Sequence, residues 1–203
     1  MPPFLFILHA KYAILYVENF HICIGAIMDI VSHGLWGGIV FGRKDKRTFL
    51  LSFLFGIAPD ALSFGVFFIA IFLGLEASLD FSDGQPADSE VPFYVHYLYS
   101  WTHSVVVFAV AFLALWALQR RPVIEFLAWG LHIAVDIPTH DATFFPTPFL
   151  WPIADVSVSG IPWIHPIVFI PNIVALAGLY YWFFYRKNQG AQVRTADLLR
   201  REL

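Results

Sequence analysis

The sequence has very little cysteine and little charge. Its one cysteine, Cys23, excludes an internal disulfide and any zinc site built from several cysteines. Only 13% of the 203 residues are charged, whereas soluble domains usually have about 25%. The few basic residues stand in short clusters beside apolar runs, so no basic, aromatic-interleaved face is available for nucleic acid. Any metal site in this chain therefore has to use histidine and carboxylate ligands.

Apolar residues are abundant, at 59% of the chain, with 22 Phe and 7 Trp. A helix needs about 20 apolar residues to cross the roughly 30 Å hydrocarbon core of a bilayer. We therefore predict an all-α, polytopic integral membrane helical bundle of about five transmembrane helices, with residues 28–186 as one membrane domain. The apolar segments that approach or reach this length are 29–42, 48–75, 95–118, 122–138 and 162–185.

The two ends of the chain differ from this central part. Residues 1–27 are apolar but interrupted by His9 and Lys11, and they form a doubtful N-terminal extension that would add a sixth span if it is real. Because Met28 opens a more ordered motif, we expect translation to begin there. Residues 187–203 are polar and charged and are expected to form a cytoplasmic tail.

The charges of the loops predict an orientation. Basic clusters at 43–47, 120–121 and 186–187 alternate with an acidic stretch at 76–92 and a polar stretch at 139–160. Positively charged loops stay on the cytoplasmic side. We therefore expect a bacterial cytoplasmic (inner) membrane protein with its C-terminus in the cytoplasm and 139–160 as an ordered outer loop.

Four of the apolar segments carry ionisable side chains near the middle or outer half of the membrane. Such side chains cost a few kcal/mol or more in a bilayer and by default mark functional sites. They are His33, Asp60, His103, His132 and Asp136. A cation that gathers these groups from separate helices would explain their common depth.

The spacing of two of these residues favours a metal. His132 and Asp136 are one helical turn apart and share a face, and Asp29 and His33 repeat the spacing in reverse order. Imidazole and carboxylate ligands suit zinc, manganese or iron(II). We expect a divalent metal, zinc first, with manganese or iron as alternatives.

Each of these candidate ligands could instead have a purely structural role. His132 could be an interior hydrogen-bonded histidine, His103 part of a polar cluster at a helix start, and His33 a bridge between helices. Asp60 could cap a helix after a Pro59 kink. A break at Pro59 would instead expose backbone and aim Asp60 inward, and one at Pro138 would do the same for His140.

Several short motifs resemble the YdjM-like family of predicted membrane-bound metal-dependent hydrolases. They are Ser32-His33-Gly34, Gly56-Ile57-Ala58-Pro59-Asp60, Trp101-Thr102-His103-Ser104, Leu131-His132-Ile133-Ala134-Val135-Asp136 and Thr147-Pro148-Phe149-Leu150-Trp151-Pro152. The resemblance covers about 28–152 and implies metal ligation by His33, Asp60, His103, His132 and Asp136. Family members often carry another histidine shortly before Thr-His-Ser, where this chain has Tyr99 and Trp101.

The resulting functional hypothesis is a metal-dependent hydrolase that acts on a lipid-linked or membrane-embedded substrate, possibly a phosphoester, through metal-activated water. Asp60 or Asp136 would act as a general base, and His140 would deliver a proton to the leaving group. The expected partners are the lipid bilayer and the lipid-linked substrate, with no nucleic acid. Two alternatives stay open: a proton or cation transporter and a membrane scaffold with a structural metal.

Overall fold

Helices are the regular elements of the residues that the computed structural model describes, which are 30–77, 90–143 and 145–186, and these residues contain no strand. The predictions for 1–27, for Asp29 and for 187–203, and most of the acidic stretch, lie outside these residues. The described helices are Ile30–Phe41, α2 (Lys46–Leu62), α3 (Phe64–Phe72), α4 (Phe93–Thr102), α5 (Val105–Gln119), the 3-10 turn η2 (Ile124–Phe126), α6 (Leu127–Thr139), α7 (Pro166–Tyr180) and the π-helical turn η3 (Tyr181–Arg186).

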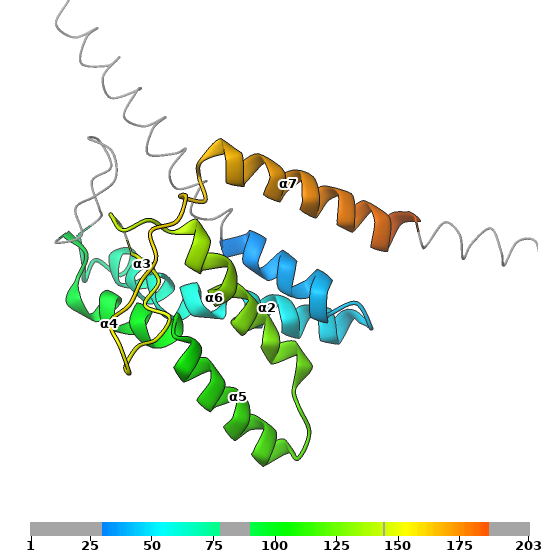
Figure 1. Ribbon diagram of the computed structural model, residues 1–203, viewed down its shortest axis with the longest axis horizontal. Coiled ribbons are helices and arrows are strands. Elements are labelled where there is room, and N and C mark those ends of the chain that lie inside the picture. Colours follow the sequence, from blue (N-terminus) through cyan, green and yellow to red (C-terminus); the bar gives the residue numbers. More distant parts are fainter. Residues whose placement is uncertain (1–29, 78–89, 144, 187–203) are drawn as a thin grey trace, which may run out of the picture.

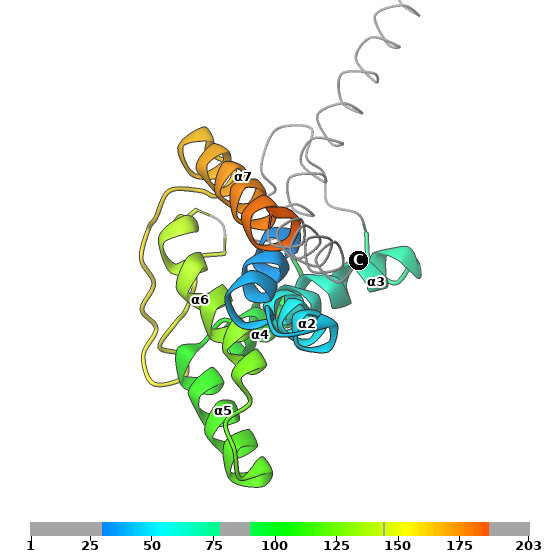
Figure 2. The same ribbon diagram turned by 90° about the vertical axis from the view of Figure 1, so that its right-hand side faces the viewer.

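Helix α2 is at the centre of the bundle. It packs most extensively against α6 and also contacts η2, α4 and α3, while α5 packs against α6. Viewed from the side, α7, the helix Ile30–Phe41 and α2 are stacked on one another, with α5 and α6 beside them (Figures 1 and 2).

Hydrogen bonds between side chains tie α7 to the helix Ile30–Phe41. The Trp36 indole N–H donates to Asn172 Oδ1 at 2.7 Å, and Asn172 Nδ2 donates to Ser32 Oγ at 3.0 Å. The Tyr180 hydroxyl donates to the Leu35 carbonyl oxygen at 3.0 Å. In an apolar surrounding such bonds hold helices together because lipid offers polar groups no other partner.

Local sequence signals define where two helices begin. Asp45 and Thr48 form a capping box at the start of α2, with Thr48 N–H donating to Asp45 Oδ1 at 2.9 Å and Asp45 N–H donating to Thr48 Oγ1 at 3.1 Å. Ser104 caps α5 by accepting from the N–H groups of Val106 and Val107.

Two glycines allow the helix Ile30–Phe41 to approach α2 closely. A Cβ at Gly37 would lie 2.5 Å from the Ser52 carbonyl oxygen, and one at Gly56 would lie 2.6 Å from the His33 carbonyl oxygen. Glycines at such positions are typical of membrane helix pairs because they bring backbones into contact. The contact at Gly56 places its backbone directly beside His33.

Two helices are sharply bent. α2 and α3 meet at Ser63 with a bend of 64°, and α4 and α5 meet at His103–Ser104 with a bend of 56°. The predicted break at Pro59 is therefore displaced: α2 continues through Pro59 to Leu62. Ser63 Oγ donates to the Pro59 carbonyl oxygen at 2.9 Å, which partners a carbonyl at the bend.

The predicted outer loop packs against the second bend. The Val105 N–H donates to the Phe149 carbonyl oxygen at 2.9 Å, and the Ser104 hydroxyl donates to the carbonyl oxygen of Trp151. These bonds satisfy backbone groups that a continuous helix would pair internally. The loop residues thus support the break that holds His103.

By length and composition, Pro166–Tyr185 is the one helix in the described part of the chain that could cross a bilayer alone. The number rises to three if each bent pair, α2 with α3 and α4 with α5, counts as one span. α5 has no buried residue, and large apolar side chains such as Leu113 and Leu118 are exposed on it. A span count of about five stays a prediction.

Three helix ends carry basic residues. The loop between Ile30–Phe41 and α2 and the end of α7 lie at the right of Figure 1, and the end of α5 lies at its lower edge. They carry the clusters 43–47 and 120–121 and the residue Arg186. Successive segments alternate in direction from left to right and back in this view.

Candidate functional site

Six ionisable side chains from four helical segments meet in the interior. His33 comes from Ile30–Phe41, Asp60 from α2, His103 from the break after α4, and His132, Asp136 and His140 from α6 and its C-cap. The structure thus brings together the six residues expected to act as ligands or catalytic groups, while Asp29 lies outside the described residues. Five of them are almost fully buried, with exposed fractions of 4% for His33, 7% for Asp60, 0% for His103, and 1% for His132 and Asp136.

The carboxylate of Asp136 is at the centre of the cluster. Its Oδ1 lies 3.0 Å from His33 Nε2, and its Oδ2 lies 3.0 Å from His132 Nε2 and 3.3 Å from His103 Nε2. His140 Nε2 is farther away, at 3.9 Å from Oδ1. The i, i+4 spacing of His132 and Asp136 on α6 gives the close pair that the sequence predicts.

Asp60 approaches the same imidazoles from α2. Its Oδ1 lies 3.4 Å from His103 Nε2, and its Oδ2 lies 3.8 Å from His132 Nε2. The Nε2 atoms of His103 and His132 are themselves only 3.0 Å apart. Two carboxylates and two imidazole nitrogens therefore point at one small volume.

The other ring nitrogens of these histidines are held by backbone carbonyls. His132 Nδ1 lies 2.7 Å from the Gly56 oxygen, and His103 Nδ1 lies 3.2 Å from the Tyr99 oxygen. Since a carbonyl oxygen only accepts, each Nδ1 carries the proton, and in the neutral ring Nε2 is a bare lone pair. This arrangement, in which a carbonyl fixes the tautomer and ring orientation, is typical of metal-ligating histidines.

Neighbouring groups fix the orientation of the His103 ring further. The Tyr99 ring stacks on it, with centroids 3.8 Å apart and planes 20° from parallel. Thr102 Oγ1, which donates to the Leu98 carbonyl oxygen, lies 3.0 Å from His103 Nδ1 and can accept from it. Tyr99 thus orients the His103 ring by stacking on it.

His140 has a similar arrangement at the edge of the cluster. Its Nδ1 lies 3.1 Å from the Phe145 carbonyl oxygen, which also accepts the Tyr99 hydroxyl at 3.0 Å. Its side chain is 15% exposed, compared with 10% for Asp60 and 3% or less for the other four. Phe145 has a positive φ of 47°, a conformation uncommon for a bulky residue. This conformation directs its carbonyl towards both Tyr99 and His140.

The cluster has the features of a metal site. Its side chains fall into two overlapping groups whose ligand atoms all lie within 4.8 Å of one another, namely His33, Asp60 and His132, and His103, His132 and Asp136. Asp136 Oδ1 is buried and, within the described part of the chain, has no hydrogen-bond partner, although His33 Nε2 is 3.0 Å away. Converging lone pairs without protons between them fit a cation, so these buried groups could hold a metal ion.

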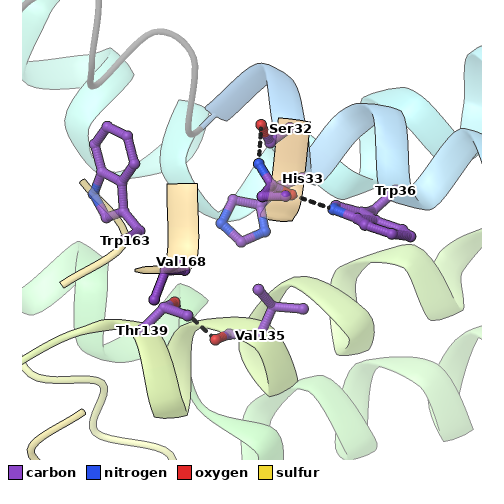
Figure 3. Close-up of a pocket in the computed structure, with 8 residues that line it drawn as sticks. Ser32, His33, Trp36, Val135, Thr139, Trp163 and Val168 are labelled. Carbon is purple, nitrogen blue, oxygen red and sulfur yellow. Dashed lines mark hydrogen bonds between the residues drawn. The ribbon is translucent and has the colours of Figure 1, made fainter. Parts of the chain in front are cut away.

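A small cavity reaches the cluster from the side of α7. It has a volume of about 50 Å³, enough for several waters. Figure 3 shows the His33 ring between Ser32 and Trp36 of its own helix and Val135 and Thr139 of α6. This cavity gives water room beside the imidazole of His33.

Sequence reasoning identified the ionisable groups but missed the groups that orient them. The Gly56 carbonyl, the Tyr99 ring and the Phe145 carbonyl had no assigned role. Gly56 stands in the Gly-Ile-Ala-Pro-Asp motif, and a small residue at a helix interface was the available signal for it. Nothing in the sequence indicates the conformation of Phe145.

Comparison of the chain with family models, with curated proteins and with solved structures found no match.

Proposed function

We propose that this protein is a polytopic membrane hydrolase that depends on a divalent metal, with zinc as the first choice. The proposed ligands are His33, Asp60, His103, His132 and Asp136. The observation that carries the proposal is the convergence of Nε2 lone pairs and carboxylate oxygens from separate helices in a buried volume.

Charge compensation supports a metal. Asp60 and Asp136 are buried, and a buried carboxylate without a compensating charge costs several kcal/mol. The stretches 12–42, 48–119 and 122–185 contain no Lys or Arg. The compensating charge must therefore come from protons on the histidines or from a metal.

Protons on His103 and His132 alone compensate the two carboxylates incompletely. If His103 and His132 were both protonated, two N–H donors would face each other with their Nε2 atoms 3.0 Å apart. At most one of this pair can carry the extra proton in the observed geometry. A divalent cation supplies both charges at once and accepts the lone pairs as ligands.

The donor set also limits the kind of metal. Imidazole and carboxylate without thiolate suit zinc, manganese and iron(II). The groups of converging ligand atoms found in the described part of the chain contain no cysteine. A bound divalent metal of this kind lowers the pKa of a coordinated water towards neutrality and polarises the scissile group.

Residues of the chain supply the general base, the proton donor and the positioning of the ligands. Asp60 or Asp136 takes the proton of the attacking water as general base. His140 holds a proton for the leaving group: its Nδ1 faces the Phe145 carbonyl, and its Nε2 lies 3.9 Å from Asp136 Oδ1 at the partly exposed edge of the site. Tyr99 keeps the ring of His103 in place by stacking.

The arrangement of helices supports a membrane-embedded site. Successive segments alternate in direction (Figure 1), and every second connection carries basic residues, which fits five passes with the basic ends and the C-terminus in the cytoplasm of a bacterial cell. The resemblance to the YdjM-like family favours hydrolysis. A site at this depth suits a lipid-linked substrate such as a phosphoester, which would enter from the bilayer.

Metal content tests the first half of the proposal. Wild-type protein, purified in detergent with zinc present and then freed of excess metal, is expected to retain stoichiometric zinc by elemental mass spectrometry. His132→Ala and Asp136→Asn should lose it, and His165→Ala, which removes an exposed histidine that caps α7, should retain it. Circular dichroism and elution volume report whether each variant is folded.

Retention of stoichiometric zinc in folded His132→Ala and Asp136→Asn would end the metal assignment.

Hydrolysis of lipid phosphoesters should be abolished by chelation, restored by zinc, and absent in Asp136→Asn. If instead reconstituted vesicles show cation flux that depends on Asp136 and no hydrolysis, the protein is a transporter and the hydrolase proposal is wrong.

A further inference from the structure

A second cavity lies beside the basic loop 43–47 and the end of α7, and none of its lining residues belongs to the histidine cluster. It has a volume of about 430 Å³, within the range of about 300–1,000 Å³ that is usual for ligand pockets. It is formed by the loop before α2, the first turn of α2 and the end of α7 and η3. The lining residues are Gly42, Arg43, Lys44, Asp45, Lys46, Phe49, Tyr180 and Phe184.

The loop side of this cavity is positively charged. Arg43, Lys44 and Lys46 are exposed and line it. The acid among them, Asp45, already accepts the Thr48 N–H in the capping box of α2. Three cations against this one carboxylate leave the lining with a net positive charge.

One of these cations is held in position. The Arg43 guanidinium carbon lies 4.5 Å from the centre of the Phe183 ring, a cation–π contact between the loop and η3. Guanidinium groups fixed in this way retain their N–H donors, which match the oxygens of a phosphate.

The opposite side of the cavity is aromatic. Phe49, Tyr180 and Phe184 contact one another, with ring centroids 6.3 Å apart for Phe49 and Tyr180, 5.8 Å for Phe49 and Phe184, and 5.3 Å for Tyr180 and Phe184. The neighbouring rings of Tyr181 and Trp182 are exposed. Aromatic rings at the end of a membrane span mark the level of the lipid headgroups.

We infer that this cavity binds the headgroup of an anionic phospholipid of the cytoplasmic leaflet. Cations on one wall meet the phosphate, and rings on the other wall meet the glycerol and the first part of the acyl chains. Basic pockets between membrane helices on this side of the bilayer have the chemistry for such headgroups. The inference does not depend on the histidine cluster or on hydrolysis.

The test is the lipid dependence of thermal stability. Protein in micelles of neutral phosphatidylcholine is titrated with phosphatidylglycerol at constant ionic strength. The variants are Arg43→Gln/Lys44→Gln and the matched control Arg120→Gln/Arg121→Gln, which removes the same charge from the exposed turn after α5.

Wild type and the Arg120/Arg121 control should show a saturable rise in melting temperature. The Arg43/Lys44 variant should need at least a tenfold higher lipid fraction for half of that rise. Equal weakening in both double variants would mean diffuse attraction to negative charge and would overturn the inference, as would the absence of any saturable rise in wild type.

A parallel titration with inorganic phosphate separates a lipid from a free anion. If phosphate at the same ionic strength stabilises wild type as much as the lipid does, the occupant is a soluble anion and the lipid assignment is wrong. If phosphate has no such effect and native mass spectrometry finds the lipid retained by wild type but not by the Arg43/Lys44 variant, the assignment stands.

Discussion

Replacing Gly56 by alanine tests whether backbone contacts, and not only ligand side chains, define the cluster. The new Cβ would lie 2.6 Å from the His33 carbonyl oxygen and 3.0 Å from the Gly34 Cα. That is about 0.8 Å inside an ordinary van der Waals contact, and the obstructing atoms are backbone, which cannot rotate away. The helix Ile30–Phe41 must therefore move away from α2.

This displacement affects the site in two ways. His33 moves with its helix, and the Gly56 carbonyl that accepts from His132 Nδ1 at 2.7 Å moves with α2. Functional constellations have to be held within about 0.5 Å, so a shift of this size matters. Loss of a group that orients a metal-bound histidine typically costs about 10–100-fold in metal affinity, which corresponds to about 1.4–2.7 kcal/mol.

The assay is zinc competition against a chromophoric chelator in detergent. Gly65→Ala in α3 is the matched control, because its Cβ would meet its nearest atoms, Ala61 Cβ and Asp60 O, at an ordinary 3.7 Å. Both changes raise helix propensity equally, by about 1 kcal/mol. If Gly56→Ala binds zinc within twofold of Gly65→Ala, the close contact at Gly56 does not position the ligands, and the reasoning is wrong.

Two further predictions concern stability. Zinc at about 100 times its dissociation constant should stabilise the wild type by about 2.7 kcal/mol. For a chain of this size, that corresponds to a rise of roughly 5–11 °C in melting temperature. Zinc should leave the melting temperature of His132→Ala unchanged, and a similar rise in both proteins would refute binding at the cluster. Asp45→Ala should lower the melting temperature at pH 7, because the backbone N–H of Thr48 stabilises the charged carboxylate and lowers the pKa of Asp45 below its usual 3.8. The contribution of the Asp45 carboxylate is complete above its unfolded pKa and is lost as the pH falls through its lower folded pKa. In a pH series of melting curves, the difference in melting temperature from wild type should therefore decrease in acid and vanish below the folded pKa. A difference that does not change with pH would contradict this reasoning.

The positions of the helices follow closely from the sequence. The described helices fall in each of the apolar segments expected to form them, because a segment in an apolar environment must pair its backbone groups internally. The bends are less predictable. The presence of proline predicted a break at Pro59, but α2 continues through Pro59 and the chain bends at Ser63. The break at His103 depends on partners from residues 149 and 151, which no local pattern reveals.

The histidine cluster, too, is only partly predictable from the sequence. His132 and Asp136 pair because of their spacing on one helix, which the sequence contains in full. The cost of burying ionisable groups in an apolar environment was enough to select His33, Asp60 and His103 as their partners. The distances among them depend on how the helices cross, and the sequence does not contain those distances.

The sequence by itself determined three features of the protein. They are the apolar helical character of the chain, the positive charge of three of its helix ends, and the identity of the ionisable side chains that form the buried cluster. The tertiary structure alone decided that Nδ1 of His132 faces Gly56 and that the Nε2 atoms of His103 and His132 lie 3.0 Å apart. The physical reason is range. Burial cost and helical periodicity act residue by residue along the chain, whereas the orientation of an imidazole depends on a carbonyl 76 positions away that is brought beside it only by packing.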